Sequence, residues 1–280
     1  MDSTFVFGTV GSPISTPKKP GGSVGAILHL HSLGLSAFEL GWVQSVRVSE
    51  DTCRLIRETA QNSQTALSVH APYYINLNAT DEEWQKSRKR LFDAAYYGAL
   101  AGATDIVFHP GSYFGMEISD VMSKSIDRLR DVSKELSDLN IDVTLRPETM
   151  GKSAMIGSLE DTLEMSQVVP NVKPCLDFAH LHARPGDGSI NTEKEWDKIF
   201  DAYQQALGSE SLRHLHIHLS GIEYTAKGEK NHLPIQESDL DLKALYSSMH
   251  KFGCGGRILC ESPILEEDAL FLKQSWINNQ

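Results

Sequence analysis

Histidines and acidic residues stand at or just after the ends of several short apolar segments. Six such residues, one for each successive segment, are His70, His109, Glu148, Asp177, His218 and Glu261. A seventh candidate, His180, follows Asp177 by three residues. Imidazole and carboxylate groups are the usual ligands of Zn²⁺, Mn²⁺ and Fe²⁺ in proteins. One histidine at a strand end is commonly a surface or capping residue, but the whole set predicts a shared metal site.

Eight β-rich segments are expected to position these side chains. They cover residues 4–9, 35–40, 66–70, 105–109, 142–146, 173–177, 212–218 and 257–260. Several are nearly continuous apolar runs, which are typical of strands that are covered on both faces. The segments between them favour helices, and the clearest of these are 81–101, 118–139, 158–168, 192–207, 240–252 and 265–276. Strand and helix therefore alternate along the chain.

This alternation favours an α/β fold, a (β/α)₈ TIM barrel formed by a single domain over residues 1–280. The strand starts are roughly 30–40 residues apart, which suits βα units in a parallel sheet. The competing doubly wound fold would need a glycine-rich phosphate loop after its first strand, and Gly8 and Gly11 lack that spacing. In a barrel, the carboxyl ends of the strands form one ring, where catalytic residues are found. All six strand-end candidates would then share this mouth.

The composition of the 280 residues, with 40% hydrophobic and 22% charged residues, is that of an ordinary globular protein. No apolar stretch is long enough to span a bilayer, and residues 1–4 lack the features of a secretory signal. The four cysteines are scattered, which favours reduced thiols and a cytoplasmic location. The net charge of −11 counts against a non-specific nucleic-acid binder, although three bound divalent cations would offset about six of these charges.

Two other chemistries fit the residues less well. Glu148 and Glu261 would suit the carboxylate pair of a glycosidase, but that function leaves the histidines without a role. A serine or cysteine nucleophile is not indicated, because the chain has no Gly-x-Ser-x-Gly motif and no cysteine in a setting that clearly stabilises a thiolate. No lysine stands at a strand end, which argues against Schiff-base chemistry.

Six short motifs resemble those of the endonuclease IV family of apurinic/apyrimidinic endonucleases. They begin at residue 70 (HAPYYINLN), residue 108 (FHPGS), residue 147 (PET), residue 175 (CLDFAH), residue 216 (HIHLS) and residue 260 (CESP). The resemblance covers residues 5–273 and is greatest to the archaeal-type and related bacterial branch. It implies a TIM barrel and a metal-dependent DNA-repair enzyme.

The resemblance also implies a site for up to three Zn²⁺ ions, with Mn²⁺ or Fe²⁺ as alternatives at one or more positions. The residues that match ligands of the first ion are His70, His109 and Glu148. Those that match ligands of the second ion are Glu148, Asp177, His218 and Glu261. His180 matches a ligand of the third ion. A carboxylate that bridges two ions lies beside the attacking water, so Glu148 is also the candidate general base.

The third metal site departs from the family pattern. The family completes it with an Asp-x-His pair after the seventh strand, whereas this chain has Glu229 and, one position later than the pattern, His232. A loop can absorb one extra residue, whereas in a strand the shift would turn the side chain to the other face. Expecting a loop here, we predict that His232 still ligates the third ion and that Glu229 contributes little.

The implied activity is hydrolysis of the phosphodiester 5′ to an abasic site in double-stranded DNA, giving a 3′-hydroxyl and a 5′-deoxyribose phosphate. The duplex must be opened at the lesion. Tyr73 and Tyr74 match the family's inserting loop and are candidate DNA-binding wedges. Basic residues in or near the βα loops, among them Arg146 and Arg184, are candidate phosphate contacts. We expect a monomer that acts in base excision repair.

Two alternatives stay open. Metal-dependent sugar isomerases and epimerases of the same barrel superfamily work with a smaller ligand set around one ion or a pair. The residues that would suffice for such a site are Glu148, Asp177, His218 and Glu261. The additional histidines favour the nuclease, and metal stoichiometry separates the two functions. The other alternative is a barrel that binds metal, has lost catalysis and serves as a binding module.

Overall fold

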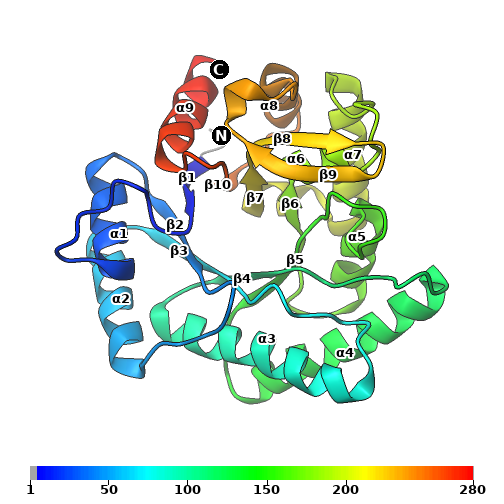
Figure 1. Cartoon of the computed structure of the whole chain (residues 1–280), viewed down its shortest axis with the longest axis horizontal. Coiled ribbons are helices and arrows are strands. Elements are labelled where there is room, and N and C mark those ends of the chain that lie inside the picture. The colour runs from blue at the N-terminus through cyan, green and yellow to red at the C-terminus, as the bar shows by residue number, and fades with distance from the viewer. Residues whose placement is uncertain (1–4, 280) are drawn as a thin grey trace.

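Parallel strands form the inner wall of a barrel, and helices cover its outside (Figure 1). The computed structural model describes residues 5–279. Thr4, the first residue of the strand expected at 4–9, therefore lies outside the described residues. The same holds for the rest of segment 1–4, which was considered for a secretory signal. Within residues 5–279, no helix has the length and apolar character needed to cross a membrane.

The barrel strands are β1 (Phe5–Val10), β2 (Ala37–Gly41), β3 (Ala66–His70), β4 (Asp105–Phe108), β5 (Thr144–Pro147), β6 (Cys175–Asp177), β7 (Leu215–Leu219) and β10 (Gly256–Cys260). Their order in the sheet is β5-β4-β3-β2-β1-β10-β7-β6, and all of these neighbours pair in parallel. The two edges meet through isolated parallel bridges, Leu145 with Val172 and Glu148 with Cys175. The predicted TIM barrel is confirmed.

The outer elements are α1 (Gly22–Ser32), α2 (Glu50–Asn62), α3 (Asp81–Ala101), α4 (Ile118–Asp138), α5 (Leu159–Val168), α6 (Phe178–Ala183), α7 (Glu193–Leu207), α8 (Leu242–Lys251) and α9 (Glu266–Asn278), with 3₁₀ turns η1 (Ser209–His214) and η2 (Ile235–Glu237). Local sequence sets their ends. The side chain of Ser158 accepts from the backbone N–H of Asp161, and the Asp161 carboxylate accepts from the backbone N–H of Ser158. This reciprocal cap starts α5 as the sequence predicts.

The packing of α3 shows which strand residues point outward. A Cβ atom on Gly98 would lie 2.7 Å from Ile106 Cδ1 and 3.1 Å from Val69 Cγ2, so the helix approaches β3 and β4 closely at this point. Because side chains alternate along a strand, Ser68 and His70 point to the opposite side from Val69, into the barrel. Val69 and Ile106 therefore pack under α3, whereas Ser68 and His70 belong to the interior.

The chain after β7 differs from the sequence-based expectation. Residues predicted to form a loop are the strands β8 (Gly221–Thr225) and β9 (Gly228–Leu233), which pair as an antiparallel hairpin. The side chain of Ile222 packs against Ala179 and Ala183, so the hairpin lies on α6 at one edge of the mouth (Figure 1). Residues 212–214, expected at the start of the seventh strand, belong to η1. The hairpin therefore forms this edge of the mouth.

A buried ion pair stabilises the amino end of the barrel. Arg146 Nε donates to Asp105 Oδ1 at 2.6 Å, and Arg257 Nη2 lies 3.0 Å from Asp105 Oδ2. Burial raises the pKa of Asp105, but the two guanidinium groups outweigh it and hold this pKa below its usual range. The carboxylate is therefore charged at neutral pH, and both of its oxygens are paired with cations.

We predict that Asp105→Asn destabilises the fold strongly, because it leaves Arg146 buried with no anionic partner. Removing one partner of a buried pair costs about 3–5 kcal/mol. The matched control is Asp93→Asn, which breaks the exposed Lys89–Asp93 pair on α3 and should cost under about 1 kcal/mol. Urea unfolding of the two variants measures the difference. Equal costs would show that the buried pair has no special role in stability.

Candidate metal centre

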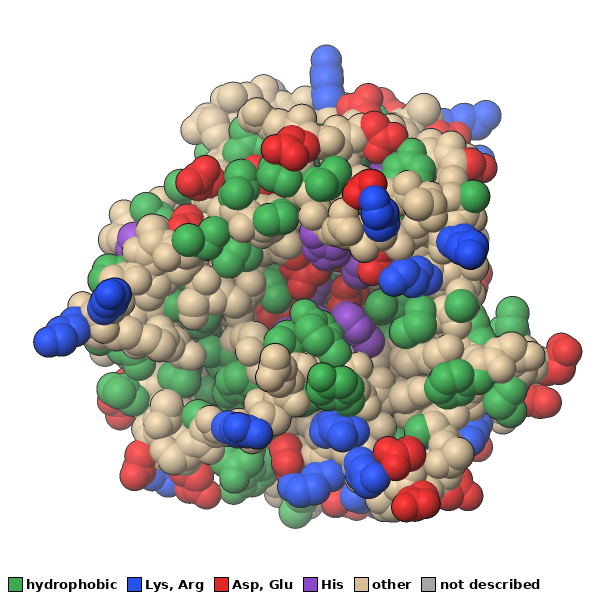
Figure 2. Space-filling view, in the orientation of Figure 1, with side chains coloured by type: hydrophobic (Ala, Val, Ile, Leu, Met, Phe, Trp, Pro, Cys, Tyr) green, Lys and Arg blue, Asp and Glu red, His purple; other side chains and the backbone are tan. Residues whose placement is uncertain are grey.

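The sequence-predicted ligands converge at the carboxyl end of the barrel. Figure 2 shows histidine and acidic side chains at the bottom of a hollow in this face. The residues at or next to strand ends are His70 (β3), His109 (β4), Glu148 (β5), Asp177 (β6), His218 (β7) and Glu261 (β10). Asp177 and His218 are register partners on β6 and β7, so their side chains share the inner face. His180 comes from α6 and His232 from β9.

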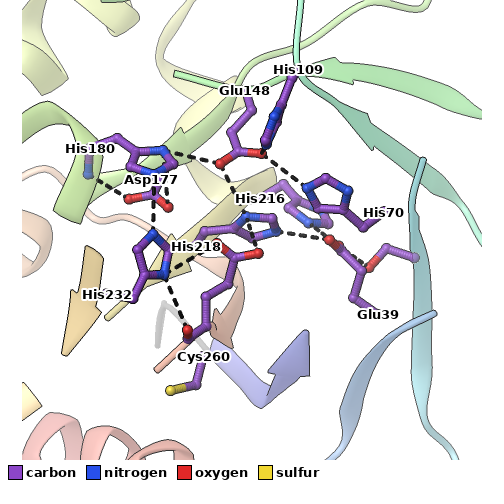
Figure 3. A network of polar contacts seen from close by, with 12 residues as sticks. Glu39, His70, His109, Glu148, Asp177, His180, His216, His218, His232 and Cys260 are labelled. Atoms are coloured by element: carbon purple, nitrogen blue, oxygen red, sulfur yellow. Dashed lines mark hydrogen bonds and ion pairs between the residues drawn. The ribbon is translucent and has the colours of Figure 1, made fainter. Parts of the chain in front are cut away.

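The carboxylate of Glu148 lies at the middle of the group, fully buried (Figure 3). Its Oε2 is 3.3 Å from the Nε2 atoms of both His70 and His109. Its Oε1 is 3.2 Å from His180 Nδ1 and 3.7 Å from His218 Nδ1. One carboxylate thus faces imidazoles carried by three strand ends and a helix.

Backbone carbonyls fix the orientation of two of the rings. The Nδ1 atom of His70 lies 2.9 Å from the carbonyl oxygen of Ala71, and His180 Nδ1 lies 2.9 Å from that of Thr149. A ring that donates its Nδ1 proton to a carbonyl keeps a lone pair on Nε2. In that tautomer the Nε2 atoms of both residues face the other candidate ligands as acceptors, which is the form a metal ion requires.

A β-bulge in the hairpin brings Glu229 and His232 to one side. Ile222 pairs with His232, Glu223 with Asn231 and Tyr224 with Glu229, so Lys230 is the extra residue on β9. In a regular strand, residues three apart would point to opposite faces. The extra residue in the bulge shifts the alternation by one position, so Glu229 and His232 point to the same face. This corrects the expectation of a loop, because here a strand absorbs the additional residue.

The bulge produces a second cluster beside the first. His232 Nε2 lies 3.2 Å from His180 Nε2, and Glu229 Oε2 lies 3.6 Å from the same His180 atom. The group Asp177, His180 and His232 can offer ligand atoms that all lie within 4.8 Å of one another. Glu229 approaches only the His180 side of this group, so its contribution stays a prediction.

Two glycines allow the hairpin to approach the loop after β5. A Cβ atom on Gly151 would lie 2.6 Å from Glu229 Cβ and 3.1 Å from His180 Cδ2. Gly228 has φ +91°, and its own Cβ would lie 2.2 Å from the carbonyl oxygen of Gly151. The backbone N–H of Glu229 donates to that same carbonyl at 2.9 Å. This contact holds Glu229 over the mouth.

The donor set and its unpaired atoms fit metal ions. Besides the cluster with His232, three further groups of close ligand atoms are present. Two belong to the mouth, one of His70, His109 and Glu148 and one of Glu148, Asp177, His218 and Glu261, and the third consists of Cys175, His216 and His218. Buried polar atoms normally have partners. Among the described residues, however, Glu148 Oε1, Asp177 Oδ2 and Glu229 Oε2 have no hydrogen-bond donor. Anionic oxygens without donors, facing imidazole nitrogens, are what a cation would satisfy.

The pKa shifts show that the carboxylates are crowded. Burial, with a further contribution from the charge of Glu148, raises the pKa of Asp177 to about 6. Burial also acts to raise the pKa of Glu148, but the facing histidines, His109 above all, hold it well below its usual value. The two acids are thus driven apart in pKa by sharing one buried site. A cation between them would favour the ionised form of both.

Sequence reasoning missed the acid below this group. Glu39, on β2, is fully buried, and its Oε1 lies 3.0 Å from Nε2 of His218. Its Oε2 lies 2.9 Å from Nε2 of His216, also in the barrel interior (Figure 3). The missed signal is a glutamate inside the apolar run 35–40, because a buried charge needs a partner.

Exposed aromatic side chains lie at the rim of the mouth. The ring of Tyr73 stacks on His109, with centroids 5.0 Å apart, so it forms part of the wall of the centre. Tyr74 is 65% exposed, and Arg90 lies over its ring. Phe114, which the sequence did not indicate, is equally exposed and lines the same surface cavity, of about 510 Å³, as both tyrosines.

Two of the basic residues considered as phosphate contacts have other partners. Arg146 is buried at the amino end of the barrel, so the expectation that it contacts phosphate is wrong. Arg184 donates from Nη1 to the carbonyls of Met150 and Lys152 and from Nη2 to that of Met155. These hydrogen bonds tie Arg184 to the loop after β5. The guanidinium groups of both arginines thus bond to other parts of the protein.

Comparison with known proteins agrees with this geometry. A family model described as a xylose isomerase-like TIM barrel matches residues 27–275. An uncharacterised protein of Methanocaldococcus jannaschii is 36% identical over 97% of both chains. A probable endonuclease 4 of Shouchella clausii is 28% identical over 75% of this chain and 71% of its own length. The resemblance to endonuclease IV that the motifs indicated is thereby confirmed.

Solved structures show the same fold with different functions. Endonuclease IV from Thermus thermophilus superposes with a TM-score of 0.69 at 20% identity, covering 97% of this chain and 98% of that one. A D-tagatose 3-epimerase-like protein gives a TM-score of 0.68 at 16% identity, covering 97% and 96%. At these identities the likeness concerns the fold alone, so the function must be argued from the side chains.

We predict that Gly151→Ala weakens one metal site selectively, because the added methyl would push Glu229 and the ring of His180 away. Zinc analysis after dialysis should find about one ion fewer per chain. The matched control is Gly41→Ala at the end of β2, where the nearest atom to a new Cβ, Gly11 Cα, is at an ordinary 3.6 Å. Unchanged zinc in Gly151→Ala would mean that the hairpin does not position a metal ligand.

Proposed function

Because the chain belongs to the xylose isomerase-like TIM barrel family, we propose that it is a metal-dependent apurinic/apyrimidinic endonuclease. It hydrolyses the phosphodiester 5′ to an abasic site in double-stranded DNA and leaves a 3′-hydroxyl and a 5′-deoxyribose phosphate. The relatives named endonuclease 4 support this assignment at 28% identity. The role would be base excision repair in the cytoplasm, by a monomer, and sedimentation would check the oligomeric state.

The number of convergent donors is the observation that carries the proposal. A sugar isomerase or epimerase would need only the group of Glu148, Asp177, His218 and Glu261. That group is present, and it favours an epimerase as the second candidate, which the similar fold of a D-tagatose 3-epimerase-like protein allows. The proposal is supported by His70 and His109, which lie on one flank of this group, and by His180 and His232, which lie on the other. These flanking histidines have no role in the smaller site.

We assign three ions to the three groups. His70, His109 and Glu148 would hold the first, and Glu148, Asp177, His218 and Glu261 the second. His180 and His232 would hold the third, with Glu229 as a weaker ligand. Nitrogen and oxygen donors suit Zn²⁺, with Mn²⁺ or Fe²⁺ as alternatives. Ions at these positions would supply an activated water and stabilise the negative charge of the attacked phosphate.

The side chains account for the remaining requirements of the reaction. Glu148 is ionised and lies at the middle of the group, so it is the candidate general base for the attacking water. Tyr73 covers His70 and His109 and limits access of solvent to their side of the mouth. The exposed rings at the rim would stack on bases next to the extruded abasic nucleotide, which has little stacking of its own to lose.

The decisive test is cleavage of a duplex that carries one abasic site, with and without chelator. We expect a nick 5′ to the lesion with a 3′-hydroxyl end, loss of activity after chelation, and recovery with Zn²⁺. Glu148→Gln should reduce the rate at least about 100-fold, because it removes both a ligand and the base. Epimerisation of a ketose by the metal-loaded protein, with no nicking, would favour the second candidate instead.

We predict that His232→Ala binds about one zinc ion fewer per chain and loses much of its nicking rate, because its Nε2 lies 3.2 Å from His180 Nε2 in the third group. Excess Zn²⁺ should restore part of the rate, since the other two groups stay complete. The control is His31→Ala, an exposed histidine on α1, which should keep all ions. Elemental analysis gives the stoichiometry. Full occupancy in His232→Ala would remove this residue from the ligand set.

We predict that Tyr74→Ala weakens binding to an abasic duplex by about 10-fold, because only a duplex must be opened by an inserted ring. Binding to an abasic single strand should change little. Tyr74 suits this test better than Tyr73, whose loss would also uncover His70 and His109. Leu55→Ala, an exposed apolar residue on α2, is the control. Equal losses on both substrates, measured by fluorescence anisotropy, would contradict a wedge.

A further inference from the structure

A buried carboxylate lies directly below the candidate metal centre and belongs to none of its three groups. Glu39 is carried by β2 and has no exposed surface. An unpaired charge in such a place would be strongly destabilising, so its partners should reveal its role. All three polar partners belong to the barrel interior, namely Ser68, His216 and His218.

The two oxygens of Glu39 have different tasks. Oε2 accepts a hydrogen bond from Ser68 Oγ at 2.6 Å and lies 2.9 Å from His216 Nε2. Glu39 and Ser68 are register partners on β2 and β3, so the serine holds the carboxylate from the side. Oε1 is left for His218, whose Nε2 is 3.0 Å away. Oε2 thus anchors the carboxylate, and Oε1 faces a candidate ligand.

The ring of His218 connects Glu39 to the metal centre. Its Nδ1 lies 3.5 Å from Glu261 Oε1 and 3.7 Å from Glu148 Oε1, on the side where the second ion would be held. Its Nε2 is on the far side of the ring, toward Glu39 (Figure 3). A neutral imidazole has one protonated nitrogen and one lone pair, so a partner at one nitrogen decides which nitrogen can ligate.

We propose that Glu39 is a positioning residue of the metal centre. Its Oε1, 3.0 Å from Nε2 of His218, favours the proton on that nitrogen and so presents the Nδ1 lone pair to the second ion. Its negative charge also makes that nitrogen a stronger donor, as outer carboxylates do for metal-bound histidines. The inference rests on the proposed metal centre but not on DNA as substrate. It gives a reason for a charged residue in an otherwise apolar strand.

A purely structural role for Glu39 makes different predictions. If the carboxylate only tied together β2, β3 and β7, its loss would destabilise the metal-free fold and would weaken all the ions together. A positioning role acts through His218 alone, so it affects the single ion that His218 contacts. The rings of His70 and His180 are oriented by backbone carbonyls, so Glu39 is not needed to orient them.

The experiment compares Glu39→Gln with Ser68→Ala in the full chain. Glutamine keeps the shape and removes the charge, whereas Ser68→Ala removes a partner of the same carboxylate without touching His218. Competition with a chromophoric zinc chelator measures each ion's affinity. We expect Glu39→Gln to weaken one ion 10–100-fold, the usual effect of losing an outer carboxylate, and to leave the others unchanged. Ser68→Ala should change every affinity by less than about threefold.

Two further measurements keep the result independent of stability and of nuclease activity. The visible spectrum of the Co²⁺-loaded protein should change in Glu39→Gln, because the geometry at one histidine changes, while thermal unfolding in chelator should stay close to wild type. If Glu39→Gln does not fold, Glu39→Asp, which keeps the charge but moves it away from His218, should show the same single-ion loss.

Wild-type affinity for every ion in Glu39→Gln would overturn the inference, as would equal weakening of all ions together with a destabilised metal-free fold. A wild-type chain that binds no ion would overturn the proposed metal centre itself. Bound ions without nicking of abasic DNA would count against the proposed function only. The three failures are therefore distinguishable.

Discussion

Electrostatic crowding around Glu148 is the constraint on which the arrangement of the mouth depends. Its buried carboxylate faces imidazoles from β3, β4, α6 and β7 at 3.2–3.7 Å, and the acids Asp177 and Glu261 lie close by. Buried carboxylates this close together would repel one another, and some of their oxygens would stay unpaired, unless cations lay between them. The barrel supplies rigid positions for all of them, because each strand end adds one side chain to the same ring.

The hairpin shows how an added residue can be accommodated without losing a site. Lys230 bulges from β9, and Glu229 and His232 consequently face the same way. Glycine at positions 151 and 228 lets this strand contact the loop after β5 through backbone atoms. A cluster that includes a helix residue, His180, and a hairpin residue, His232, thus depends on backbone contacts that lie outside the barrel strands.

Polar groups inside the barrel are arranged in levels from the amino end to the mouth. Arg146, Asp105 and Arg257 form the lowest level, and His216, the register partner of Arg257, lies next to them on β7. Glu39 then joins His216 to His218, the first residue of this series that faces the candidate ligands of the mouth. Each buried charged group in this series therefore contacts a group of opposite charge or an imidazole, so none of them is buried without a polar partner.

The alternation of apolar strands and amphipathic helices was enough to predict the barrel, and the strand-end positions predicted which side chains would meet. His70, Glu148 and Glu261 are far apart in sequence but were expected together, because parallel strands of similar length end at one face. The hairpin was not predicted, since its residues 221–233 are mostly polar and the bulge at Lys230 breaks the alternation that identifies a strand. Glu39 was also overlooked, as its role exists only through a partner on β7, 179 positions later in the chain at His218. The position of each ligand at the end of a strand could be predicted from the sequence, because side chains alternate along a strand. Contacts between distant strands decided which ring nitrogen faces the metal centre and which acid is buried below it.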